Sequence, residues 1–266
     1  MTLALIAGAG GLPAALVAAL PQRPFVAVLD GFAPEGVAPD VTFRVERLMP
    51  FLRQLEDAGV TAVCFAGAVQ RPRLDPALFD PATATIVPRL LAAMGQGDDA
   101  TLREVIAVFE EAGFAIRGVA EIAPALVPAA GLYAGAMGPR DEADAARAAT
   151  IVAALGRVDV GQGAVVQQGL CLGVETLSGT DAMLASVAGL SGLRPAGAKG
   201  LFYKAPKPLQ DRRIDLPTLG PDTVRNVAGA GLGGIVWEAG GVITLDLPAM
   251  VREADERGLF LCARPA

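Results

Sequence analysis

Apolar runs alternate with amphipathic stretches along the first half of the chain. Residues 3–7 are all apolar and lead into a glycine-rich turn, a pattern typical of a buried parallel strand. Residues 49–58 place apolar and charged side chains on opposite sides of a helix, with Gly59 as its C-terminal cap. The same pattern predicts further strands at 25–29, 41–45, 60–66 and 114–116, and further helices at 13–20, 85–94 and 102–112.

The glycine-rich turn at residues 8–13 lies between a strand and a helix, and Asp30 ends the next strand. This order is typical of the start of a Rossmann-like domain, in which glycines let a phosphate approach the helix N-terminus. The dinucleotide fingerprint has a third glycine where this chain has Pro13, which weakens the case for NAD. A structural turn, a contact to a nucleotide or sugar phosphate, and an NAD site all stay open.

Residues 120–139 are nearly uncharged and are interrupted by prolines and glycines. We interpret them as the crossing between two domains, 1–130 and 131–266, both of the α/β class. Thr180 or Asp181 is the expected N-cap of a helix that ends at residue 190. The other predicted helices are 140–158, 221–230 and 248–257, and the predicted strands are 164–175, 233–238, 241–245 and 259–261.

Charged residues are concentrated in one stretch, residues 204–223, of a chain in which only 19% of residues are charged. Prolines and a glycine keep this stretch out of regular structure, so we predict a stiff loop that fixes the positions of its charges. Carboxylates can hold a hard ion such as Mg²⁺, while Lys and Arg neutralise phosphate oxygens. The alternative is a loop whose charges form surface ion pairs.

Composition excludes several classes of protein. A net charge of −6 argues against a general nucleic-acid binder, which would carry a basic face. The chain has no histidine, which excludes Ser–His and Cys–His catalysis, imidazole-based zinc sites and the metallophosphatases that need histidine. Acid–base or metal chemistry therefore depends on Asp, Glu, Lys, Tyr or Cys.

The compartment is predicted from cysteine usage and from the absence of targeting signals. Cys64, Cys171 and Cys262 are far apart in apolar runs, which predicts buried thiols in a reducing cytoplasm. The N-terminus lacks the basic region of a signal peptide, and no apolar run is long and unbroken enough to span a membrane. Contact with a membrane surface stays open.

Five segments are informative together, and in chain order they are 8–13, 67–72, 97–99, 169–181 and 204–223. They resemble a known bacterial family, the histidine-independent UDP-2,3-diacylglucosamine pyrophosphatases of lipid A biosynthesis. The resemblance runs nearly end to end, and Ser178 departs from the acidic residue expected there.

The resemblance implies an α/β protein with a Rossmann-like N-terminal domain and a catalytic second domain of unusual topology. It implies Mg²⁺-dependent hydrolysis of UDP-2,3-diacylglucosamine to UMP and 2,3-diacylglucosamine 1-phosphate (lipid X), with water attacking the phosphorus on the sugar side. It also implies a cytoplasmic protein that is peripheral at the inner membrane, does not bind nucleic acid, and accommodates acyl chains in an apolar groove. Self-association into a homodimer stays open.

Site residues follow from the resemblance together with the charged stretch. We expect Asp222 first, then Asp215 and Asp211, as catalytic groups, with Asp222 as a metal ligand or as the base that orients water. The expected metal ligands are Asp222, Asp211, Asp215, Asp181 and Glu175. The expected substrate-binding residues are Gly10, Gly11, Arg71, Asp98, Asp99, Lys204, Lys207, Gln210, Arg212, Arg213, Thr180 and Thr223.

Two other functions remain as alternatives. An NAD(P)-dependent oxidoreductase would use the turn at 8–13 and Asp30, but it leaves the charged stretch unexplained. A lipid- or nucleotide-sugar-binding protein would have the same residues and no turnover.

Overall fold

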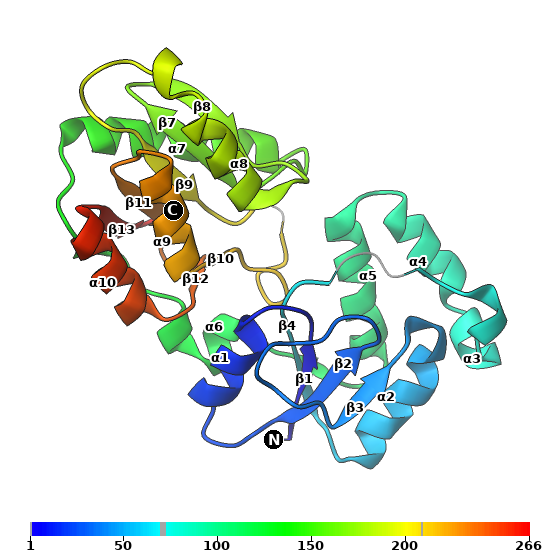
Figure 1. Ribbon diagram of the computed structural model, residues 1–266. Coiled ribbons are helices and arrows are strands. Elements are labelled where there is room, and N and C mark those ends of the chain that lie inside the picture. The colour runs from blue at the N-terminus through cyan, green and yellow to red at the C-terminus, as the bar shows by residue number, and fades with distance from the viewer. Residues whose placement is uncertain (1, 70–72, 209) are drawn as a thin grey trace. The chain divides into compact units, whose positions relative to one another are not determined.

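The computed structural model describes residues 2–69, 73–208 and 210–266, which form two compact units (Figure 1). Unit 1 comprises Met1–Ala125 and Asp211–Asp215, and unit 2 comprises Leu126–Gln210 and Leu216–Ala266. Both units combine helices with sheets, which confirms the predicted α/β class. The chain first leaves unit 1 after Ala125, slightly before the boundary expected at residue 130.

Unit 1 is built on a five-stranded parallel sheet. Its strands are β1 (Leu3–Ala7), β2 (Phe25–Leu29), β3 (Val41–Phe43), β4 (Ala62–Ala66) and β5 (Ala115–Ile116). They lie in the order β3-β2-β1-β4-β5, which is the order of a doubly wound sheet. β1 is paired in parallel with β2 on one side and β4 on the other. Ligands of such sheets bind beyond the carboxyl ends of the central strands, so the turns after β1 and β4 are the candidate positions here.

Helices join these strands. They are α1 (Leu12–Ala19), α2 (Leu48–Asp57), α3 (Pro81–Ala84), α4 (Val87–Met94), α5 (Asp98–Glu111) and α6 (Val119–Ile122), with 3₁₀ helices η1 (Val45–Arg47), η2 (Pro76–Leu78) and η3 (Pro124–Leu126) near them. Phe51 of α2 and Phe109 of α5 share a core with Ile6 and Val63 of the sheet. The two rings meet edge to face at a centroid separation of 6.5 Å, a favourable geometry for aromatic pairs.

The segment Asp211–Asp215 comes from the charged stretch but belongs to unit 1. Ile214 packs against the core that α5 shares with the sheet. Arg213 pairs with Glu110 of α5 at 2.8 Å, and a Cβ on Gly118 would lie only 3.1 Å from the Arg213 Cα. The charged stretch is therefore not one loop: unit 1 holds its middle, and unit 2 holds its two ends.

Unit 2 is built on a six-stranded mixed sheet in the order β6-β13-β11-β9-β7-β8. The strands are β6 (Gly131–Ala134), β7 (Gly163–Gln167), β8 (Leu170–Val174), β9 (Leu201–Lys204), β11 (Gly234–Glu238) and β13 (Phe260–Arg264); β10 (Thr218–Leu219) and β12 (Ile243–Thr244) form a separate parallel pair. The central strands β9, β11 and β13 are parallel, whereas β6 and β7 run antiparallel to their neighbours. Antiparallel strands thus flank a parallel centre.

Helices cover both faces of this sheet. They are α7 (Pro139–Gly156), α8 (Gly179–Ala188), α9 (Pro221–Gly229) and α10 (Leu247–Arg257), with η4 (Ser191–Leu193) after α8. Alternate strand residues enter two separate cores: Leu201 and Tyr203 pack with α7, and Phe202 packs with α8, α9 and α10. Because side chains alternate along a strand, Lys204 lies on the same face as Phe202, the face that α8 and α9 cover.

The structure corrects several local predictions. Residues 131–134 form the edge strand β6 inside the stretch interpreted as a crossing. Residues 164–175 form a hairpin whose turn, Gln168–Gly169, has positive φ at both residues, 50° and 78°. Two such residues fit a type I′ turn, which matches the twist of the paired strands. The helix expected from residue 102 begins at Asp98 instead.

Two further predictions were wrong at single residues. The N-cap of α8 is Ser178, not Thr180 or Asp181, and its side chain makes no capping hydrogen bond. The thiols are not all buried: Cys64 is buried, Cys262 is half-buried and Cys171 is exposed on the edge strand β8. Burial, with a smaller effect of the Glu121 carboxylate, raises the pKa of the Cys64 thiol to about 12.

Candidate active site

A buried polar group lies where β9 ends, next to the start of α8. Lys204 is 5% exposed, and its Nζ lies 3.1 Å from Oε2 of Glu175. The Lys204 ammonium also donates to Oγ1 of Thr180, and that hydroxyl donates to Glu175 Oε2 at 3.1 Å. The structure thus brings together three residues that the sequence nominated separately. Because Lys204 neutralises Glu175, the group is charge-balanced.

Helix α9 carries the first-ranked residue, Asp222, in its first turn. The Asp222 side chain is 86% exposed, so its carboxylate is open to a ligand from solvent. A carboxylate is also favoured at this end of a helix, where backbone N–H groups are unpaired. The Oγ1 of Thr223, the next residue, accepts from the Gly220 N–H at 3.3 Å. The Thr223 side chain therefore helps to cap the N-terminus of α9.

Asp181, in the first turn of α8, lies against α9. Its Oδ1 accepts a hydrogen bond from Nδ2 of Asn226 at 2.8 Å. Asn226 is four residues after Asp222, and residues at this spacing lie on the same face of a helix. One face of α9 therefore carries both Asp222 and the amide that holds Asp181.

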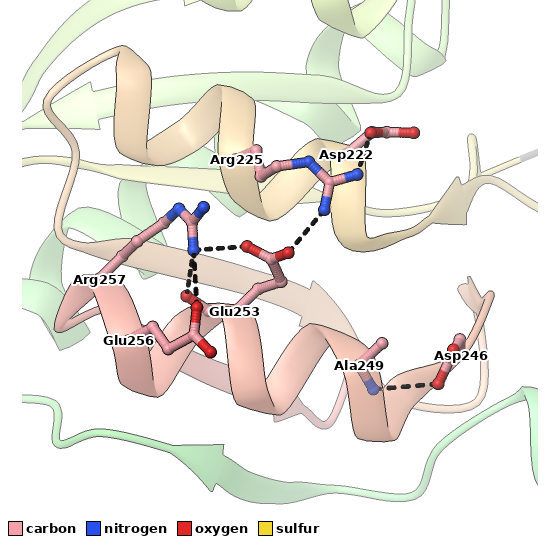
Figure 2. Close-up of polar contacts among 7 residues, drawn as sticks. All are labelled: Asp222, Arg225, Asp246, Ala249, Glu253, Glu256 and Arg257. Carbon is pink, nitrogen blue, oxygen red and sulfur yellow. Dashed lines mark hydrogen bonds and ion pairs between the residues drawn. The ribbon is translucent and has the colours of Figure 1, made fainter.

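A chain of alternating charges runs from Asp222 to α10 (Figure 2). The Arg225 guanidinium donates through Nη2 to Asp222 and through Nη1 to Oε1 of Glu253, the latter at 2.7 Å. Glu253 also pairs with Arg257, one turn later on α10, and Glu256 lies 3.6 Å from the same arginine. The two carboxylates raise the pKa of Arg225, the Asp222 hydrogen bond being the largest cause.

The prolines at the start of the charged stretch lie in a backbone that side chains hold in place. Oε1 of Gln210 accepts from Nε2 of Gln162 at 2.6 Å and from the Lys207 N–H at 2.9 Å. The Lys207 ammonium pairs with Asp159, and both Lys207 and Gln210 are buried. These residues hold the stretch against unit 2.

Four nominated residues of the charged stretch belong to unit 1. Both oxygens of Asp211 accept from Arg213, which pairs at 2.7 Å, and Arg213 also pairs with Glu110. The hydrogen bond from Arg213 lowers the pKa of the Asp211 carboxyl below its usual value, although partial burial opposes the shift. Asp211 is thus a firmly ionised anchor. Arg212 is exposed, and Asp215 is half-buried.

The glycine-rich turn after β1 is packed against the turn after β4. A Cβ on Gly8 would lie 2.6 Å from the Ala68 carbonyl oxygen, so only glycine allows this approach. Gly10 has φ of 90°, and Gly11 is the N-cap of α1. This geometry gives the turn a structural role and leaves a phosphate contact at Gly10 and Gly11 as a prediction.

Three nominated residues of unit 1 remain, together with Asp30. Asp98 and Asp99 form the first turn of α5. Arg71 lies outside the residues that the structure describes. Asp30, the acid that an NAD site would use for a ribose, pairs with Arg44 at 2.7 Å.

The acidic residues can be compared with what Mg²⁺ requires. In the described part of the chain, no three Asp, Glu, Cys or His side chains come together as a ready-made metal site. Mg²⁺, however, is usually held by one or two carboxylates, with waters and substrate phosphates completing its shell. Asp222 and Asp181, exposed on neighbouring helices of unit 2, fit that requirement. Glu175 and Asp211 fit it less well, because Lys204 and Arg213 bind their oxygens.

Comparison with known proteins covers both units. Family models described as the LpxI N-terminal domain and the LpxI C-terminal domain match residues 2–126 and 129–262. The UDP-2,3-diacylglucosamine pyrophosphatase LpxI of Caulobacter vibrioides (strain ATCC 19089 / CIP 103742 / CB 15) is 39% identical over 268 residues, which are 97% of this chain and 96% of that protein. The chain belongs to the LpxI family. This membership confirms the resemblance found in the sequence.

In this LpxI-family chain, the sequence did not nominate several residues that hold the site. Arg225 and Asn226 could have been found, because they lie three and four residues after Asp222 on a predicted helix. Asp159, Gln162 and Glu253 carry no such local signal, since they reach the site from other elements of unit 2.

Among the helices that the structure describes, none combines the length and apolar character needed to cross a membrane.

Proposed function

We propose that this chain hydrolyses the diphosphate of UDP-2,3-diacylglucosamine to UMP and 2,3-diacylglucosamine 1-phosphate, as a step of lipid A biosynthesis. The observation that carries the proposal is the 39% identity, over 97% of the chain, to a protein named UDP-2,3-diacylglucosamine pyrophosphatase LpxI. Identity at this level over both units makes a shared reaction the simplest inference. The side chains described above are consistent with that reaction.

Breaking a diphosphate depends on positioning the substrate and neutralising charge more than on covalent catalysis. The chain has no histidine, so carboxylates and cationic side chains must do this work. Asp222 is exposed on α9, so its carboxylate is accessible to substrate or to water. An ordinary aspartate is a weak base at neutral pH, so a ligand role is favoured over proton abstraction alone.

Mg²⁺ is the proposed cofactor, with Asp222 and Asp181 as its first ligands. When bound, it would neutralise charge that develops on the phosphate oxygens. Asp215 and Asp211 remain candidates for the same role or for catalysis, and Glu175 remains a candidate for the same role. The residues proposed to contact substrate are Gly10, Gly11, Arg71, Asp98, Asp99, Thr180, Lys204, Lys207, Gln210, Arg212, Arg213 and Thr223.

The location of the protein is part of the same proposal. A diacylated substrate resides in a lipid phase, so the enzyme would work in the cytoplasm at the surface of the inner membrane. The acyl chains would need an apolar surface to contact. Release of the product, lipid X, would return it to the same membrane.

A turnover assay tests this function. Purified wild-type protein is incubated with UDP-2,3-diacylglucosamine in detergent, with Mg²⁺ or with excess EDTA, and the products are resolved by mass spectrometry. The expected result is equal amounts of UMP and the acylated sugar 1-phosphate with Mg²⁺, and loss of turnover with EDTA that added Mg²⁺ restores. Binding of the substrate without turnover would instead support a binding protein.

A further inference from the structure

Asp222 lacks the packing that usually fixes the direction of a functional side chain. It is 86% exposed, and the hydrogen bond described for its carboxylate comes from Arg225, one turn later on the same helix. A free aspartate at a helix start samples several rotamers. Efficient chemistry requires reacting groups to be held close to the productive geometry, so the partner of Asp222 matters.

Arg225 is itself held by a residue from another helix. Its Nη1 donates to Oε1 of Glu253 on α10 at 2.7 Å, while its Nη2 donates to Asp222 (Figure 2). The planar guanidinium presents both donors in a fixed fork, so the position of one carboxylate sets that of the other. The exposed fraction of the side chain falls along this series of ion pairs, from 86% at Asp222 to 42% at Arg225 and 23% at Glu253. The connection therefore leads from solvent toward the packed interior.

The inner end of this chain is fixed by α10. Glu253 pairs with Arg257 one turn later, and its neighbour Ala254 is fully buried in the core shared by α9 and α10. Glu253 thus has a backbone set by packing and a side chain with two cationic partners. It is the rigid point from which the direction of Asp222 can be set.

We propose that Arg225 and Glu253 are positioning residues for Asp222, with α10 fixing the catalytic carboxylate of α9 through the Arg225 guanidinium. The proposal rests on the proposed function, because it assigns the network to turnover of the same substrate. A bridging arginine does what a single ion pair cannot: it links the orientation of Asp222 to a second element of the fold.

An ordinary surface ion pair would have a different signature. The two arginines that pair with Glu253 are 42% and 33% exposed and stay accessible to water, so removing Glu253 should lower the melting temperature only slightly under either view. A merely structural network would leave kcat unchanged at equal stability. A positioning network lowers kcat while KM and the melting temperature stay near those of the wild type, because only the geometry of the reacting group is lost.

Glu253→Ala is the first test, with Glu256→Ala as the matched control. Both substitutions remove a glutamate from α10, but Glu256 is paired with Arg257 and not with Arg225. We expect Glu253→Ala to lower kcat about 10-fold, as is common for groups that orient a functional ligand, and Glu256→Ala to match the wild type. Glu253→Gln keeps an oxygen that can accept from Arg225 and should recover part of the loss.

A double variant shows whether the effect passes through Asp222. In the Asp222→Asn background, adding Glu253→Ala should cause no further loss of residual kcat, since the group being positioned is already gone. Arg225→Lys keeps the charge but cannot bridge both carboxylates, so its kcat should fall about as much as that of Glu253→Ala.

The outcomes separate this inference from the proposed function. Wild-type protein without turnover would overturn the proposed function. Wild-type turnover with Glu253→Ala as active as Glu256→Ala, or with a full further loss in the Asp222→Asn background, would overturn the positioning role alone.

Discussion

Asp211 and Asp222 are aspartates of the same charged stretch, yet their surroundings give them different roles. Asp211 has both oxygens bound by Arg213, whereas Asp222 is mostly exposed at the end of a guanidinium that Glu253 holds. A carboxylate with both oxygens engaged stabilises the fold, and an open one can meet a ligand. Composition does not separate the two, because each aspartate has an arginine two or three residues away, and only the fold shows that Arg213 binds both oxygens of Asp211 while Glu253 holds Arg225.

Asp211→Asn should reduce stability in a pH-dependent way. The pKa of Asp211 is lowered by Arg213, so its stabilising effect is complete above the unfolded pKa of about 3.9 and is lost as the pH falls through the lower folded value. We expect the variant to melt about 1–3 °C below wild type at pH 7 and the gap to close below about pH 4. Thermal unfolding from pH 7 to pH 3 measures this, with Asp57→Asn, an exposed carboxylate of α2, as control. A gap that persists at low pH would contradict the assignment.

At the scale of elements, the β7–β8 hairpin shows how one helix holds another element in place. Asp144 of α7 is 4% exposed, and its oxygens accept from the backbone N–H groups of Gln168 at 2.8 Å and Gly169 at 2.7 Å. These two residues form the type I′ turn, so the carboxylate satisfies donors that the turn leaves unpaired. The sequence predicted the helix and one continuous β stretch at 164–175, but neither the turn at Gln168–Gly169 nor its contact with Asp144.

Asp144→Ala should therefore destabilise unit 2. Two N–H groups lose their acceptor, which costs about 2–4 kcal/mol in the free energy of unfolding. Asp144→Asn keeps one acceptor oxygen, so its free energy of unfolding should lie between those of Asp144→Ala and the wild type. Urea unfolding followed by the fluorescence of Trp237, which lies in the core of unit 2, reports the change. An Asp144→Ala protein as stable as the wild type would show that water replaces the carboxylate.

At the scale of the whole molecule, the chain returns from unit 2 to unit 1 for only the segment Asp211–Asp215. The apolar side chain in that segment, Ile214, packs into the core of unit 1, and Arg213 pairs with α5. Because the polypeptide passes between the two units more than once, they cannot be separated by cutting a single linker. A truncation at the expected boundary would remove part of the unit 1 core.

Ile214→Ala should loosen unit 1 and leave unit 2 intact. Ile214 is half-buried, so the substitution should lower the free energy of unfolding of unit 1 by about 1 kcal/mol. Hydrogen–deuterium exchange should then quicken in α5 and β5 of unit 1 and stay unchanged in β11 of unit 2. Leu177→Ala, which removes a fully exposed leucine of unit 2, is the control. Faster exchange in both units, or in neither, would contradict the contact described for Ile214.

The sequence predicted local structure well and long-range arrangement poorly. Uniform apolar runs identified β1, β2 and β4, because strands buried on both faces need such runs. The same criterion missed β6, an edge strand with two exposed residues, Gly131 and Leu132. The split of the charged stretch between units could not be predicted, since it depends on where Ile214 packs.

In the candidate site, too, the residues with a local sequence signal could be predicted and those placed by long-range packing could not. Asp222 and Thr223 were placed correctly at a helix start, because proline and glycine punctuate that start in the sequence. Arg225 has a local signal in its spacing from Asp222. Glu253 has none, because α10 meets α9 only in the folded unit. Charged residues that support a site from another helix need a structure to be found.

The role of Asp222 is tested most directly by the turnover of UDP-2,3-diacylglucosamine by Asp222→Ala, compared with wild type in the presence of Mg²⁺. We expect the variant to fold, to bind substrate with unchanged affinity by calorimetry, and to lose turnover at least about 100-fold, as expected for a group that meets the reacting phosphate. A variant that releases UMP at the wild-type rate would contradict the assignment of Asp222, and with it the role given to α9.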